Sequence, residues 1–167
     1  DLSSADIELI KTSHHSTALS RALVDDKTLA GNYDFIFVDC PPSLSLLTIN
    51  AMVVSDSVLI PLQSEFFALE GLSQLMLSVR EVRKSVNTGL RFEGVVLTMF
   101  DRRNNLSQQV EKDARENLGE LVFKTVIPRN VRVSEAPSHS VPVLTYEPRS
   151  RGAQAYRRLA KEFLKNN

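Results

Sequence analysis

The chain has 167 residues, 43% of them hydrophobic and 24% charged, proportions that fit one globular domain over residues 1–167 and exclude collagen-like and disordered chains. Twenty basic and 20 acidic side chains give a formal net charge of zero, so any basic surface must arise by local clustering. The single cysteine, Cys40, excludes an internal disulfide and fits the reducing cytoplasm. The apolar runs are far shorter than the ~20 residues that cross a bilayer, so we expect a cytoplasmic protein with no membrane partner.

Taken in chain order, the predicted elements alternate between helices and strands. Short helices are predicted at residues 2–11 and 16–24. The run at residues 35–38 is apolar on both faces, which is typical of a central strand in a parallel sheet. The later elements are a helix at 43–53, a strand at 57–61, an amphipathic helix between Leu69 and Gly89, a strand at 92–99, a helix at 107–118, a short strand at 122–127, a mostly looped stretch at 129–146 and a helix at 150–165.

This alternation predicts an α/β fold in which helices cover a mostly parallel sheet through right-handed crossovers. In such sheets, ligands bind at the carboxyl ends of the strands. That rule selects three segments as candidate sites, at residues 39–43, 99–104 and 127–132.

Asp39 is the first candidate site residue, because it closes an apolar strand. A carboxylate at such a strand tip can hold Mg²⁺, directly or through water, beside a nucleotide phosphate. A helix-capping role for Asp39 is an equally good interpretation of this feature alone.

The segment at residues 33–43 (YDFIFVDCPPS) resembles the Walker B and switch II segment of the ParA family, the deviant-Walker ATPases that partition chromosomes and plasmids. The resemblance continues in the family's order through residues 48–51, 59–63, 68–72, 98–101, 127–132, 135–139 and 148–152. It therefore covers nearly the whole chain and implies a three-layer P-loop NTPase-like sandwich.

Two family motifs are not found in these 167 residues. None of the six glycines is followed by lysine, so the phosphate-binding loop K-G-G-x-G-K-[ST] is absent, as is the acidic D-x-D-P-Q element. We therefore expect the catalytic residues upstream of Asp1 and none within the chain, which would not hydrolyse ATP alone. The phosphate-loop strand would lie between those of Asp39 and Leu59, so we also expect exposed strand edges that favour association.

The resemblance implies an ATP and Mg²⁺ site in this chain. Asp39 would organise Mg²⁺ through water, and Met99, Pro128 and Arg129 would lie beside the adenine base. Taken singly, each of the last three is almost as well explained as an ordinary loop residue.

The resemblance also implies that Arg103 and Arg132 bind DNA backbone without sequence preference. Guanidinium groups suit phosphate because they present forked donors and stay charged. The whole protein would then be a homodimeric partition ATPase on nucleoid DNA, released by a ParB-like centromere-binding partner. Two alternatives stay open: a non-catalytic DNA- or partner-binding remnant, and a membrane-associated ATPase similar to MinD.

Overall fold

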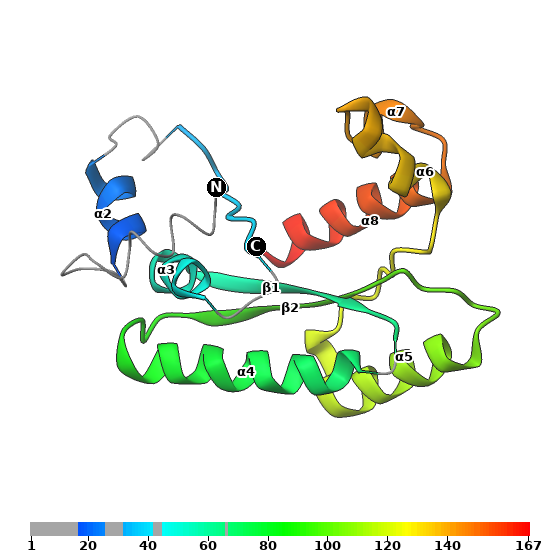
Figure 1. Cartoon of the computed structure of the whole chain (residues 1–167). Helices are drawn as coiled ribbons and strands as arrows, with labels where there is room; N and C mark the ends of the chain where they lie inside the picture. The colour runs from blue at the N-terminus through cyan, green and yellow to red at the C-terminus, as the bar shows by residue number, and fades with distance from the viewer. Residues whose placement is uncertain (1–16, 26–31, 42–44, 66) are drawn as a thin grey trace. The chain divides into compact units, whose positions relative to one another are not determined.

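The computed structural model describes residues 17–25, 32–41, 45–65 and 67–167 (Figure 1). The predicted helix at 2–11 lies outside these residues. The chain divides into two compact units, the first made of residues 1–58 and 73–92 and the second of residues 59–72 and 93–167.

Two strands, β1 (Ser57–Gln63) and β2 (Arg91–Thr98), form the sheet that the described residues contain (Figure 1). The Arg91 N–H donates to the Asp56 carbonyl, and the Ser64 N–H donates to the Thr98 carbonyl. Pairing therefore advances in the same direction along both strands, so they are parallel. The predicted strands at 57–61 and 92–99 are confirmed, and α4 (Ala68–Ser85) forms the crossover between them.

The core of the first unit lies between α3 (Leu46–Val54) and α4. Met52, Val79, Val82 and Leu90 are buried together there, which confirms the apolar stripe predicted for the long helix. The Asn87 side-chain amide donates to the carbonyls of Met52 and Ser55 at 2.9 and 2.8 Å. These bonds satisfy carbonyl groups at the end of α3, which has no further helical donors for them.

A shorter helix, α2 (Ala18–Asp25), matches the prediction at 16–24 over the residues described. Its Leu19 N–H donates to the Asn50 side-chain oxygen at 3.2 Å. Asn50 lies on α3 and is 3% exposed, so this bond ties the start of α2 to a buried polar group.

The predicted strand at 35–38 is wrong for this structure. Phe35, Ile36, Phe37 and Val38 are 41, 53, 70 and 40% exposed and belong to no strand. The reason is that a strand needs a neighbour for its N–H and C=O groups. In the part of the chain that the structure describes, the sheet consists of β1 and β2 alone.

In the second unit, α5 (Asn105–Leu118) begins at Asn104, whose side chain accepts the Leu106 N–H at 2.9 Å. It ends at Gly119, whose φ of 55° favours glycine. A single 3₁₀ turn, η1 (Gly119–Leu121), follows. Both ends of the helix are therefore fixed by local sequence.

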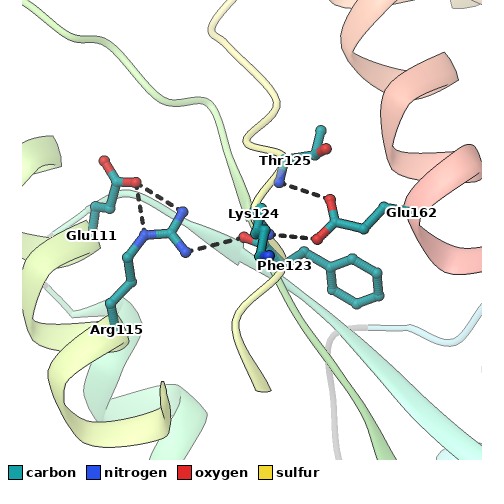
Figure 2. A network of polar contacts seen from close by, with 6 residues as sticks. All are labelled: Glu111, Arg115, Phe123, Lys124, Thr125 and Glu162. Atoms are coloured by element: carbon teal, nitrogen blue, oxygen red, sulfur yellow. Dashed lines mark hydrogen bonds and ion pairs between the residues drawn. The ribbon is translucent and has the colours of Figure 1, made fainter. Parts of the chain in front are cut away.

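The predicted strand at 122–127 is replaced by two isolated parallel bridges, Val95 with Val122 and Phe100 with Pro128. Between them, the Glu162 carboxylate accepts the N–H groups of Lys124 and Thr125 at 2.6 and 2.9 Å (Figure 2). A side chain has taken donors that a regular ladder would use, so the segment pairs with β2 only at intervals.

The stretch predicted as mostly loop at 129–146 contains α6 (Val131–Glu135), η2 (Ala136–His139) and α7 (Val143–Tyr146). These short helices pack on α8 (Arg151–Asn166) around buried Ala136, Val143 and Ala153. The α8 helix confirms the prediction at 150–165, and Ser150 caps it by accepting the Ala153 N–H at 3.1 Å. Among the helices in the described ranges, none has the length and apolar character needed to cross a membrane.

Candidate nucleotide and nucleic-acid site

Backbone hydrogen bonds bring two of the three predicted ligand segments together in the second unit. The Phe100 N–H donates to the Ile127 carbonyl at 3.1 Å, and the Arg129 N–H donates to the Phe100 carbonyl at 3.0 Å. The chain after β2 therefore lies directly beside the chain after residue 127, as the strand-end rule predicts.

A groove of about 850 Å³ opens at this junction. Its basic lining comprises Arg102, Arg103, Arg129, Arg151 and Arg158, whereas Asp101 is its one carboxylate. Phe100, Pro128 and Val131 supply apolar lining. Because guanidinium groups stay charged at any physiological pH, the lining carries a clear excess of positive charge and suits an anionic ligand.

The loop that presents Arg103 is held by several local bonds. The Asp101 carboxylate accepts the Arg103 N–H at 3.0 Å, and Gln108 donates to the Arg102 carbonyl at 2.8 Å. Below the loop, the buried Ser64 hydroxyl donates to the Thr98 carbonyl, and the Ser107 hydroxyl donates to the Ser64 carbonyl. These bonds fix the end of β1, the end of β2 and the start of α5 to one another.

The Arg103 side chain is 91% exposed and its Nε lies 3.4 Å from the Asp101 carboxylate. The pKa of Asp101 is lowered by hydrogen bonds from the Arg103 N–H and the Arg103 side chain, with the charge of Arg129 as a smaller cause. Asp101 is therefore ionised at neutral pH. The exposed guanidinium keeps donors available for a ligand.

Arg132 lies on α6 and is not among the residues that line the groove. Asn130 caps this helix by accepting the Arg132 N–H at 3.0 Å. The Arg132 Nη1 donates to Glu135 at 2.8 Å, and the Tyr146 hydroxyl donates to the same carboxylate oxygen at 3.4 Å. The hydrogen bond to Glu135 and its charge raise the pKa of Arg132.

The three residues predicted beside the base lie on the two hydrogen-bonded segments but differ in surroundings. Pro128 and Arg129 line the groove, whereas Met99 does not. Met99 directly follows β2 with a φ of 53°, a conformation that costs a non-glycine residue about 1–3 kcal/mol. It turns the chain from the strand into the Arg103 loop.

Asp39 belongs to the first unit and is exposed. Within the described ranges, no group of three or more His, Cys, Asp or Glu gathers to hold a metal ion. A single carboxylate fits a Mg²⁺ contact made through water, with phosphate oxygens as further ligands. The neighbouring Cys40 is exposed.

Sequence reasoning did not assign Arg151 and Arg158 to the site. Both lie on α8, seven positions apart and so on one helix face, with Gln154 between them. The spacing shows that they share a face. Only the packing of α8 onto Phe123 and Ile127 shows that this face borders the groove.

Comparison with known proteins gives a consistent class. Residues 1–92 match the family described as "AAA domain". The chain is 55% identical to the sporulation initiation inhibitor protein Soj of Bacillus subtilis, over 99% of this chain and 64% of that protein. It is 54% identical to the chromosome partitioning protein ParA of Caulobacter vibrioides, over 98% of this chain and 61% of that protein.

A solved structure extends the likeness to the fold. Cobyrinic acid a,c-diamide synthase from Mycobacterium smegmatis, with bound ADP and magnesium, matches with a TM-score of 0.76 and 32% identity. The match covers 99% of this chain and 59% of that one.

The family match and the structural likeness place the chain in the AAA-domain class, with the fold of P-loop ATPases. Within that class, the chain belongs to the ParA/Soj family of chromosome-partitioning ATPases, as the sequence motifs predicted. It spans less than two thirds of the length of the two curated relatives compared above.

Proposed function

We propose that the chain is the DNA-binding and base-binding part of an ATP-dependent segregation ATPase for chromosomes or plasmids. The whole protein would bind nucleoid DNA without sequence preference as an ATP dimer, in the cytoplasm, and respond to a ParB-like partner. The observation that carries the proposal is the basic groove, where five arginines and one carboxylate line the junction of two loops. The likeness to Soj and ParA supplies the class of activity.

The DNA contacts are assigned to Arg103 and Arg132. The side chain of each is at least half exposed. Arg103 lies in the loop after β2, and Arg132 lies on α6, directly after the segment that adjoins this loop. Forked guanidinium donors bind phosphate oxygens regardless of base sequence. Each phosphate neutralised adds about 0.9 to the slope of log affinity against log salt.

The nucleotide site is assigned to ATP with Mg²⁺. Pro128 and Arg129 would hold the base at the groove, Met99 would shape the turn beside it, and Asp39 would hold Mg²⁺ through water. The ADP- and magnesium-bound state of the cobyrinic acid a,c-diamide synthase structure supports this ligand class. Because no phosphate-loop motif occurs in the 167 residues, the chain alone would not hydrolyse ATP.

The test of the DNA assignment is fluorescence anisotropy with a short random-sequence duplex. We expect the double variant R103A/R132A to lose roughly tenfold or more in affinity, with a slope shallower by up to about 1.8 for two phosphates. The variant K112A removes an exposed charge from α5 outside the groove and should bind nearly as the parent. An R103A/R132A protein that binds DNA like the parent refutes the assignment.

The test of the nucleotide assignment is ATP binding by the chain and by a version extended at its N-terminus with a family-type phosphate loop. We expect only the extended version to bind MgATP. Tight binding by the chain alone would refute the view that it lacks an essential part. Extended protein that binds DNA but not ATP would favour the non-catalytic remnant, and liposome binding in place of DNA binding would favour the MinD-like alternative.

A further inference from the structure

The two arginines proposed for DNA differ from the other arginines of this surface. Arg103 and Arg132 each form an ion pair with a nearby carboxylate. Arg103 lies 3.4 Å from Asp101 in its loop, and Arg132 lies 2.8 Å from Glu135 on α6. The remaining arginines of the groove lining, Arg102, Arg129, Arg151 and Arg158, form no ion pair with any residue in the described ranges.

We infer that Asp101 and Glu135 are internal competitors of the DNA phosphates, which weaken the hold of Arg103 and Arg132 on the backbone and so set the affinity of this surface. The inference rests on the proposed function, because it assumes that these two arginines meet DNA. In this account Asp101 and Glu135 tune the strength of the phosphate contacts and do not make those contacts themselves.

The geometry favours competition over orientation of the arginines. The contact from Arg103 to Asp101 is long at 3.4 Å, and the arginine is 91% exposed, so the carboxylate restricts that side chain little. Arg132 and Glu135 are 53 and 37% exposed on a five-residue helix, where an ion pair gives little stability. What each carboxylate does supply is a negative charge a few ångströms from the place a phosphate would occupy.

Competition also has a distinct ionic signature. An arginine that a carboxylate already partly neutralises releases fewer of the cations condensed on the DNA phosphate it contacts, so that contact contributes less than the full salt dependence. Removing the carboxylate charge should therefore raise affinity at low salt and steepen the salt slope together. A purely structural role for Asp101 or Glu135 would not produce this combination.

The experiment uses the variants D101N and E135Q in the anisotropy assay. Asparagine and glutamine keep an oxygen that accepts the local hydrogen bonds but remove the charge. We expect each variant to bind duplex about three- to fivefold more tightly at low ionic strength, an advantage that shrinks as salt screens the charges. The slope should steepen by up to about 0.9 for each arginine released.

The matched control is E116Q, which makes the same charge change in an exposed α5 pair with Lys112. It should shift affinity by much less than either test variant. The coupling is checked in the R132A background, where E135Q should lose its effect because the competed arginine is gone. Circular dichroism melting establishes that each variant is folded.

The outcomes separate the two proposals. If R103A and R132A weaken DNA binding but D101N and E135Q leave it unchanged or weaken it, the competition is refuted and the DNA assignment stands. If the E135Q gain persists without Arg132, or E116Q gives an equal gain, the effect is one of net charge and the inference is also refuted. If R103A and R132A have no effect on DNA binding, the proposed function itself fails.

Discussion

Glu162 holds the segment between the two bridges of the second unit, and its replacement should cost stability in a pH-dependent way. Its carboxylate accepts two successive N–H groups, from Lys124 at 2.6 Å and Thr125 at 2.9 Å (Figure 2). Across the segment, Arg115 pairs with Glu111 and donates to the Phe123 carbonyl at 3.3 Å. The segment is therefore held by charged side chains from α5 and from α8.

The size of the effect follows from these bonds. A hydrogen bond to a charged acceptor contributes about 1.5–3 kcal/mol when well buried. Here the carboxylate is partly exposed and the freed N–H groups regain water, so E162Q should lower the free energy of unfolding by about 1–2 kcal/mol. Glutamine has one oxygen and one NH₂ group, so it cannot accept both N–H groups as the carboxylate does.

The sign of the pH dependence follows from the pKa of Glu162. Burial works to raise that pKa, but hydrogen bonds from the Thr125 side chain and from the two N–H groups outweigh it, so the pKa lies below its usual 4.5. A lowered folded-state pKa gives stability that is complete above the unfolded value and is lost as pH falls through the folded value. The parent should therefore lose its advantage over E162Q below about pH 4.5.

The assay is urea denaturation of both proteins near neutral pH and again in acid, with E116Q as the control for a surface carboxylate. E116Q should remain within about 0.5 kcal/mol of the parent. A difference between parent and E162Q that is absent at neutral pH, or equally large in acid, would refute the reasoning.

Two further substitutions test the packing of α6 and of α3. In G152A, the new Cβ would lie 2.4 Å from Val133 and 3.4 Å from Asn130, so α6 must shift. The shift should lower the free energy of unfolding by about 1–3 kcal/mol in denaturation experiments. It should also weaken DNA binding, because Arg132 lies on α6. In the matched variant G71A, on α4, the added Cβ would meet no atom within 4 Å, so the free energy of unfolding should rise by about 0.5–1 kcal/mol. Equal destabilisation of G152A and G71A would count against the packing argument. N87A removes the bonds to Met52 and Ser55 and should lower the free energy of unfolding by about 1–2 kcal/mol, whereas an unchanged urea midpoint would show that water replaces them.

The elements predicted well are those fixed by local pattern. The stripe through Leu72, Val79 and Val82 specifies α4, and Ser150 with the apolar positions after it specifies α8. The failures at 35–38 and 122–127 have a different origin. Strand formation depends on distant partners, such as a neighbouring strand or the Glu162 carboxylate, which the local sequence does not reveal.

The same distinction between local pattern and distant contacts applies to the candidate site. The strand-end rule predicts the meeting of the Arg103 loop with Pro128 and Arg129, because it follows from parallel topology. It does not predict that Arg151 and Arg158 border the groove, since that depends on how α8 packs. Nor does it reveal the carboxylate partners of Arg103 and Arg132, which the side-chain geometry supplies.

The reciprocal bonds of Phe100 have a mechanical consequence. Its N–H and carbonyl are both engaged with the chain at 127–129, so the two segments form one rim that can tilt but cannot easily separate. A displacement of the Arg129 backbone would act directly on the Phe100–Asp101 peptide through its hydrogen bond to the Phe100 carbonyl. A nucleotide and a DNA duplex bound as we propose would therefore contact segments that these two hydrogen bonds join directly.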